Sequence, residues 1–180
     1  LTKALKLFRK SNPPLMEWMS SGMVYYQAYS TIDEMKMLRS SIFTASSSLY
    51  HYLNMAQNNF REYLKTDMVR IKKYFYVLRP VLAARWIEVY NEFPPMEFQI
   101  LLEKVLPEGE VKKEVEILLE RKIRGDELDM EPRIEIINAF LETELNRLME
   151  FAKSIEGDII DPTASLDKLF RATLEEVWKV

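Results

Sequence analysis

The side chains with the clearest chemical pattern lie between residues 70 and 86 of this 180-residue chain. At 100° per residue, one side of a helix there carries two cations, a phenol and an indole, at Lys72, Tyr76, Arg79 and Trp86. Cationic side chains can pair with phosphate oxygens, and aromatic rings can stack on bases. An ordinary amphipathic helix can show the same pattern, with half-buried rings and cations that only cover its surface. From the spacing alone we favour this simpler interpretation.

The charges are divided unevenly along the chain. Residues 1–85 carry 13 Lys and Arg against 5 Asp and Glu, a net charge of +8. Residues 86–180 carry 12 against 23, a net charge of −11, which together with the first part gives the −3 of the whole chain. A basic face that meets phosphate would explain this division. Neutralisation of one part by the other across the fold would explain it equally well.

Other residues that could do chemistry form weaker patterns. His51 is the only histidine and could act as a general base, but no evident pairing with a nucleophile and a carboxylate occurs at helical spacing, so a surface or capping role is favoured. The carboxylates between Asp126 and Glu131 could bind a cation weakly, although their spacing does not fit a calcium-binding loop. The absence of cysteine excludes a disulfide framework, a thiol nucleophile and a zinc–cysteine site. No glycine-rich phosphate loop and no Ser-His-Asp order is found.

The elements that must position these residues are helices. Glycine is scarce, and the apolar residues recur with a period near 3.6. The predicted helices span residues 1–10, 15–19, 31–38, 46–65, 68–90, 96–106, 110–124, 132–154 and 161–179. Asn12 is expected to cap the second helix with Pro13 at its first position, Gly125 to end the seventh, and Pro80 to kink or break the fifth. Residues 23–29 could form a short strand or an irregular segment.

These elements predict an all-α fold in a single domain over residues 1–180, with about seven to nine helices and two long central ones. No apolar run approaches the roughly 20 residues that span a bilayer. The first ten residues are basic and amphipathic, unlike a signal peptide, and the absence of cysteine fits the cytoplasm. Because Leu1 is not an initiator methionine, we expect the chain to be a fragment.

Several sequence blocks together resemble a known family. They are KSNPPLMEWMS at 10–20, HYLNMAQNNF at 51–60, KKYFYVLRPVLAARWI at 72–87, PPMEF at 94–98, and LLERK at 118–122 followed by GDEL at 125–128. This order resembles the C-terminal helical part of the predicted nucleotidyltransferases of the DNA polymerase β superfamily, the group associated with RNA repair. The resemblance covers residues 1 to about 150, and the 72–87 block is its most specific part.

The resemblance implies an activity for the parent protein. It implies that the parent transfers a nucleoside monophosphate from a nucleoside triphosphate (NTP) to a hydroxyl acceptor, for which RNA is the candidate. Their catalytic centre is an N-terminal α/β domain with a Gly-Ser turn and an Asp-x-Asp pair that hold two Mg²⁺ ions. Neither motif occurs in this chain, so we expect it to lack the catalytic sheet and the metal-binding carboxylates and to be inactive alone. Mg²⁺ and NTP are expected for the full-length parent, and the missing catalytic domain is an expected partner.

The resemblance also assigns binding roles within this chain. The helical part closes over the nucleotide and helps to bind the acceptor, which favours the functional interpretation of the 72–86 face. Lys72, Tyr76 and Arg79 are the expected contacts to nucleotide or RNA, followed by Arg85 and Trp86. The turn at Asn12 is expected to line the cleft.

Two other interpretations stay open. A non-enzymatic helical protein-interaction module would explain the amphipathic helices and the acidic second part without any nucleotide. It predicts a complex that salt hardly weakens, whereas phosphate binding weakens steeply with salt. A metal-dependent enzyme that uses the carboxylates of residues 126–131 is a weaker possibility.

Overall fold

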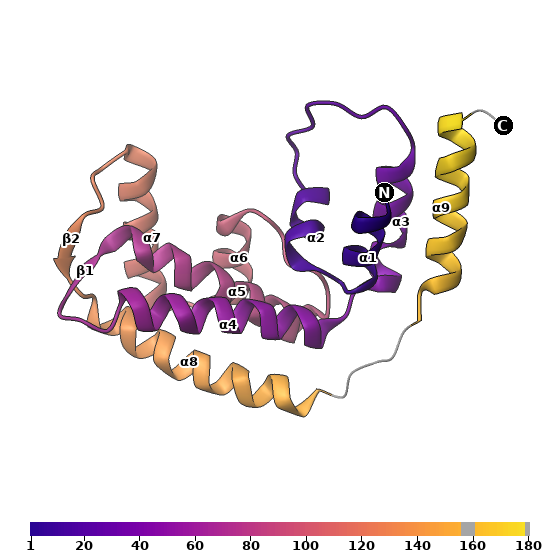
Figure 1. Cartoon of the computed structure of the whole chain (residues 1–180). Helices are drawn as coiled ribbons and strands as arrows, with labels where there is room; N and C mark the ends of the chain where they lie inside the picture. Colours follow the sequence, from indigo (N-terminus) through magenta and orange to yellow (C-terminus); the bar gives the residue numbers. More distant parts are fainter. Residues whose placement is uncertain (156–160, 179–180) are drawn as a thin grey trace.

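A computed structural model of the chain describes residues 1–155 and 161–178. The described residues form nine α-helices, one 3₁₀ helix and two short strands (Figure 1). In chain order these elements are α1 (Thr2–Arg9), α2 (Pro13–Met19), α3 (Thr31–Ile42), α4 (Ala45–Tyr63), β1 (Met68–Arg70), the 3₁₀ helix η1 (Ile71–Lys73), α5 (Tyr74–Tyr90), α6 (Phe98–Val105), α7 (Glu110–Arg124), β2 (Met130–Pro132), α8 (Glu135–Ser154) and α9 (Thr163–Trp178). The predicted all-α fold class is confirmed.

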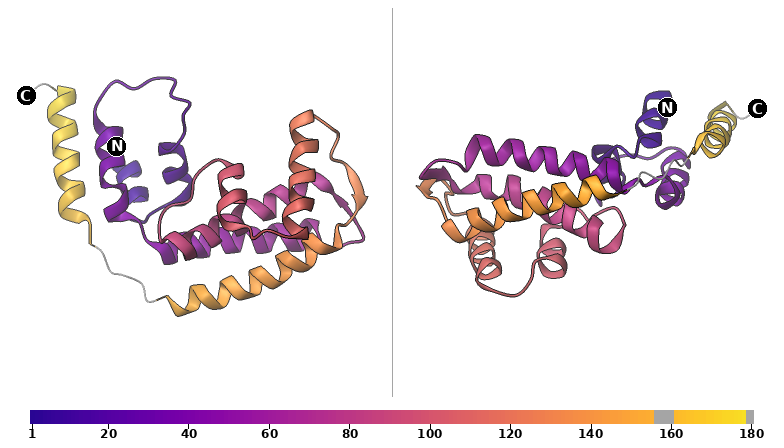
Figure 2. Two further views of the ribbon diagram at one scale, coloured as in Figure 1. Left: turned by 180° about the vertical axis from the view of Figure 1, so that it is seen from behind. Right: turned by 90° about the horizontal axis from the view of Figure 1, so that it is seen from below.

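The apolar side chains form two hydrophobic cores. The larger core lies among α4, α5, α6, α7 and α8, and α5 is its central helix because it is buried on nearly all sides. In the view from below, α8 lies between α4 on one side and α6 and α7 on the other (Figure 2). The smaller core lies among α1, α2, α3 and α9, where α9 stands beside α1 and α3 (Figure 1). Phe43 packs against both cores and so connects them.

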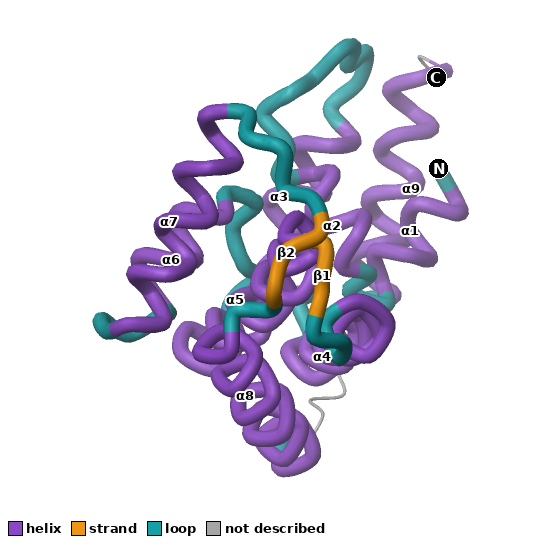
Figure 3. The backbone as a smooth tube through the Cα atoms, turned by 90° about the vertical axis from the view of Figure 1, so that its left-hand side faces the viewer, coloured by secondary structure: helices purple, strands orange, loops and turns teal. Residues whose placement is uncertain are grey.

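The two strands correct the predicted helix boundaries around α5 and α8. β1 pairs antiparallel with β2, and Val69 lies opposite Glu131 (Figure 3). The predicted helix from residue 68 therefore begins with a strand and η1, and residues 130–132, expected to end a loop and start a helix, belong to β2. Burial explains the difference, because Val69 alone is buried between two exposed neighbours, which is the period of a strand.

Helix α5 runs through Pro80 without the predicted break. Pro80 is buried, and buried residues of the larger core lie on both sides of it in α5, so packing maintains the helix across the missing hydrogen bond. Proline has no N–H, so it cannot donate to the carbonyl oxygen of Tyr76 one turn earlier. That carbonyl is left without its usual donor.

Local predictions that depend on single side chains are confirmed. The Asn12 Oδ1 accepts a hydrogen bond from the Leu15 N–H at 3.2 Å and caps α2. Gly125 ends α7 with a φ of 82°, a left-handed conformation that glycine adopts without strain. Residues 23–29 are irregular rather than a strand. The last helix is described to Trp178, and the predicted end at Lys179 lies outside the described residues.

Candidate functional site

Two of the predicted binding residues, Tyr76 and Arg79, line one pocket of about 540 Å³. The pocket lies where the first two turns of α5 meet α4, α6 and α7. Its lining is largely apolar, and the remaining residues are Met55, Phe75, Pro80, Phe98, Leu119, Lys122 and Ile123. We call this space the α5 pocket.

The edge of the α5 pocket carries an exposed ring and a cation. Tyr76 is 54% exposed, although it lies on the central helix of the core. Lys122, near the end of α7, places its Nζ 4.5 Å from the centre of the Phe75 ring. An ammonium group over a ring face is attracted by the ring quadrupole, which holds the charge beside the apolar floor. The pocket therefore combines surface on which a flat ring can stack with a cation that can meet an anion.

Arg79 is held at the pocket by a carboxylate from α2. Its Nη1 donates to Glu17 Oε1 at 3.0 Å, and the Tyr52 hydroxyl donates to the same oxygen at 2.9 Å. Burial, reinforced by the nearby Glu17 carboxylate, raises the pKa of Tyr52, so its hydroxyl stays protonated as a donor. Guanidinium has five N–H donors, and apart from this bond the described residues give Arg79 only a 3.7 Å contact from Nη2 to Met96 Sδ. Donors thus remain for a ligand.

A second group of rings and a cation lies next to the pocket. Lys73 places its Nζ 3.7 Å from the centre of the Tyr63 ring and 4.5 Å from the centre of the Tyr76 ring. Tyr63 ends α4, Lys73 ends η1 and Tyr76 lies in the first turn of α5. The segment between α4 and α5, which contains β1 and η1, therefore brings these three side chains together. Lys72 is exposed in the same 3₁₀ turn but does not line the pocket.

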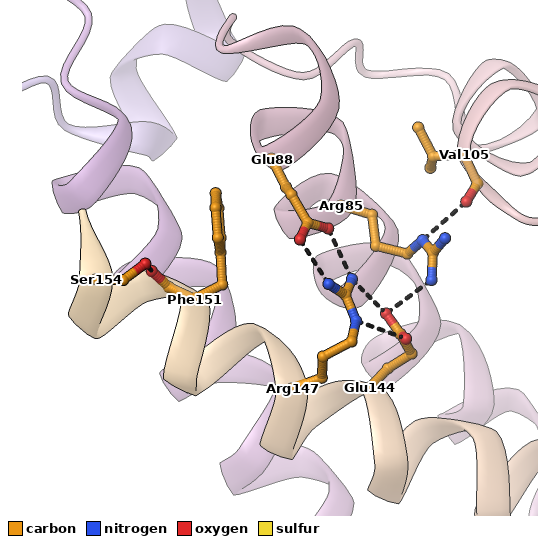
Figure 4. A network of polar contacts seen from close by, with 7 residues as sticks. All are labelled: Arg85, Glu88, Val105, Glu144, Arg147, Phe151 and Ser154. Carbon is orange, nitrogen blue, oxygen red and sulfur yellow. Dashed lines mark hydrogen bonds and ion pairs between the residues drawn. The ribbon is translucent and has the colours of Figure 1, made fainter.

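Arg85 lies away from this pocket, in a partly buried network of ion pairs (Figure 4). Its Nε donates to the Val105 carbonyl at 2.8 Å, and its Nη1 lies 2.7 Å from Glu144 Oε2. Arg147 donates to Glu144 from the same helix and to Glu88 of α5. These contacts hold α5 against α8 and against the end of α6. Their contribution to the stability of the fold accounts for the position of Arg85 without a ligand.

Trp86 and Asn12 also lie outside the α5 pocket. The Trp86 ring is half-buried against the larger core, with its centre 4.3 Å from that of Tyr90. Its buried indole N–H has no hydrogen-bond partner among the described residues. Asn12 uses its side chain to cap α2. Of the six predicted residues, the structure therefore brings only Tyr76 and Arg79 into one pocket.

The residues that the sequence pattern missed come from other helices. They are Glu17, Tyr63, Lys73 and Lys122. Three of them, Glu17, Lys73 and Lys122, fall within the blocks at 10–20, 72–87 and 118–122, but nothing in the sequence shows that these blocks meet in the fold.

Two of the loop carboxylates form ion pairs, and His51 is half-buried. Asp126 and Glu131 pair with arginines at the end of α7, Asp126 with Arg124 and Glu131 with Arg121. Among residues 1–155 and 161–178, no three His, Cys, Asp or Glu side chains come together in a way that could hold a metal ion. Burial lowers the pKa of His51 against the opposing charge of Glu17, which favours its neutral form.

Comparison with known proteins gives three findings. The family model described as "RlaP: RNA repair pathway DNA polymerase beta family" matches residues 1–172. A Bacillus subtilis (strain 168) protein described as "Uncharacterized protein YcgL" is 51% identical over 179 residues, which are 99% of this chain and 69% of that protein. No solved structure matches significantly.

No helix of the described residues has the length and apolarity that a membrane crossing requires.

Proposed function

This chain belongs to the RNA repair pathway DNA polymerase beta family, and on that premise we propose that it is the substrate-binding part of a nucleotidyltransferase. In the proposed reaction of the parent, the acceptor hydroxyl oxygen bonds to the α-phosphorus of a nucleoside triphosphate. The bond from that phosphorus to the bridging oxygen breaks, the hydroxyl proton is released and pyrophosphate leaves. The described residues are proposed to hold nucleotide or RNA for this step.

The α5 pocket is the observation that carries the proposal. Its volume of about 540 Å³ lies within the range of small-ligand sites, about 300–1,000 Å³. Phe75, Phe98 and the Tyr76 ring offer apolar and aromatic surface for a base, and Arg79 and Lys122 offer donors for phosphate.

The described residues do not fit the two-magnesium centre that the family uses. Such a centre needs several carboxylates around each ion, and the described residues bring no such group together. In the proposal, Mg²⁺ is therefore held outside the described residues, and the contribution of this chain is to bind and orient substrate.

Lys122→Gln tests the phosphate-binding side of the pocket. Gln keeps much of the side-chain length but removes the charge, so we expect the affinity for single-stranded RNA of about ten nucleotides to fall about fivefold at low salt. The slope of log affinity against log salt should become less steep by about 0.7, because one phosphate contact fewer releases one counterion fewer. Fluorescence anisotropy at several salt concentrations measures both.

Lys113→Gln is the matched control, because Lys113 is an exposed lysine of the same helix outside the pocket. Equal effects of the two changes would reject Lys122 as a phosphate contact. If neither ATP nor RNA bound at low salt, the proposed nucleotide-binding function would be rejected, and the protein-interaction module would become the favoured function.

Glu17→Gln tests whether Arg79 meets the ligand. A phosphate near Arg79 is repelled by the Glu17 carboxylate, which neutralises the guanidinium charge. A glutamine oxygen can still accept from Tyr52 and Arg79, so Arg79 keeps its position and gains net charge. We expect ATP to bind about three- to tenfold more tightly, as measured by calorimetry.

The control for this change is Glu34→Gln on α3, an exposed carboxylate outside the α5 pocket. If Glu17→Gln left ATP affinity at the wild-type value, Arg79 would be a purely structural residue.

A further inference from the structure

Tyr63, Lys73 and Tyr76 form a cluster, which we call the slot, in which the Lys73 ammonium lies over both rings. Because the Lys73 Nζ lies 3.7 Å from one ring centre and 4.5 Å from the other, the two centres can be no farther apart than the sum of these distances. A flat base between two rings needs about 7–8 Å, twice the usual contact distance between carbon atoms. In the clamp proposed below, one base takes the place of the ammonium, which this upper limit allows.

Lys73 can leave this space at little cost. None of the ion pairs among the described residues involves it, so its charge is held by the two rings. A phosphate oxygen is a stronger partner for an ammonium than a ring face, and the lysine side chain has a long flexible stem. The slot also opens to solvent, since Tyr76 is more than half exposed.

We propose that Tyr63 and Tyr76 clamp an unpaired nucleobase between their rings while Lys73 moves out to the adjoining phosphate. The clamp rests on the proposed function, because Tyr76 also lines the α5 pocket. A base in the pocket stacks on the face of Tyr76 that Lys73 leaves open, and a second base occupies the face that Lys73 vacates. Two consecutive bases thus lie on the two sides of one ring.

This arrangement defines the class of ligand. It is a single-stranded segment with at least two neighbouring unpaired bases, in RNA or in DNA. Bases within a duplex are excluded, because they are stacked and paired and must first be extruded from the helix to reach the slot. A mononucleotide fills the pocket but not the clamp.

The experiment measures the full chain by fluorescence anisotropy with single-stranded RNA, single-stranded DNA and duplex RNA of about ten nucleotides, and ATP by calorimetry. Tyr63→Leu should weaken both single-stranded ligands about tenfold and leave ATP and duplex binding unchanged, because stacking on Tyr63 is lost only for the second base. Tyr63→Phe keeps the ring and should retain wild-type affinity. This variant guards against a packing defect, since Tyr63 also contacts the larger core. Tyr50→Leu, at an exposed tyrosine of the same helix, is the matched control.

The outcomes separate the clamp from the proposed function. If ATP bound and responded to Lys122→Gln while Tyr63→Leu left the single strands at wild-type affinity, the clamp would be rejected and the pocket would stand. Equal weakening of duplex and single strands would also reject it. A preference for RNA over DNA would add a contact to the ribose hydroxyl, whereas equal binding assigns recognition to the bases and phosphates that both share.

Discussion

Glu144→Ala is expected to lower the free energy of unfolding by about 3 kcal/mol, because it leaves a buried guanidinium without its anion. The Glu144 side chain is 9% exposed and that of Arg85 is 17% exposed, so both charges are largely removed from water. Losing one partner of such a pair costs about 3–5 kcal/mol. We expect a loss at the lower end of this range, because Arg85 still donates to the Val105 carbonyl and Arg147 still pairs with Glu88.

Urea unfolding followed by circular dichroism measures this change, with Glu142→Ala as the matched control. Glu142 lies on the same helix and pairs with Lys65, but its side chain is 60% exposed. Exposed pairs contribute about 0–1 kcal/mol, so this variant should unfold close to the wild type. Similar losses in the two variants would contradict the role of the partly buried network.

The same network predicts how stability depends on pH. Burial alone would raise the pKa of Glu144, but the hydrogen bonds and charges of Arg147 and Arg85 outweigh it and hold the pKa below its ordinary value. A carboxyl group with a lowered pKa in the folded state stabilises the fold above its unfolded pKa, and this stabilisation is lost as the pH falls through the folded value. The difference in unfolding free energy between wild type and Glu144→Gln should therefore narrow as the pH falls below about 4.3. If this difference in unfolding free energy did not change with pH, the loss of stability in Glu144→Gln would be assigned to packing.

Elements fixed by local chemistry could be predicted from the sequence. Helix α7 has the predicted bounds because Gly125 ends it, and α2 begins where the Asn12 side chain caps it. β1 could not be predicted, since its residues find hydrogen-bond partners only in β2, about sixty positions along the chain. Without that partner, the residues before α5 read as one more turn of an amphipathic helix.

The candidate site was predictable only where one helix builds it. The 3.6 period places Tyr76 and Arg79 on one face of α5, and both line the pocket. The resemblance rather than the period assigned Arg85 a binding role, and in the structure Arg85 contacts Glu144 of α8 and Val105 of α6. Which side chains of other helices reach the pocket depends on how the helices cross, and a periodic pattern within one helix does not contain that information.

Tyr76→Leu is expected to have the largest effect on binding, because Tyr76 is the one ring shared by the pocket and the clamp. We expect about a tenfold loss of ATP affinity and a larger loss for single-stranded RNA, since each stacked base contributes about 1–3 kcal/mol. Tyr76 is 54% exposed, so a leucine there should leave the fold intact. Tyr76→Phe should bind as the wild type does, and Tyr50→Leu is the control for loss of an exposed tyrosine.

The double variant Tyr63→Leu/Tyr76→Leu decides whether the two rings act as one clamp. A base held between two rings loses its site when either ring is removed. The double variant should therefore bind single-stranded RNA no more weakly than Tyr76→Leu alone, with a coupling free energy as large as the whole effect of Tyr63→Leu. Additive losses would mean that each ring stacks on a separate base, and the bases would then be expected on the outer faces of the rings, with Lys73 still between them.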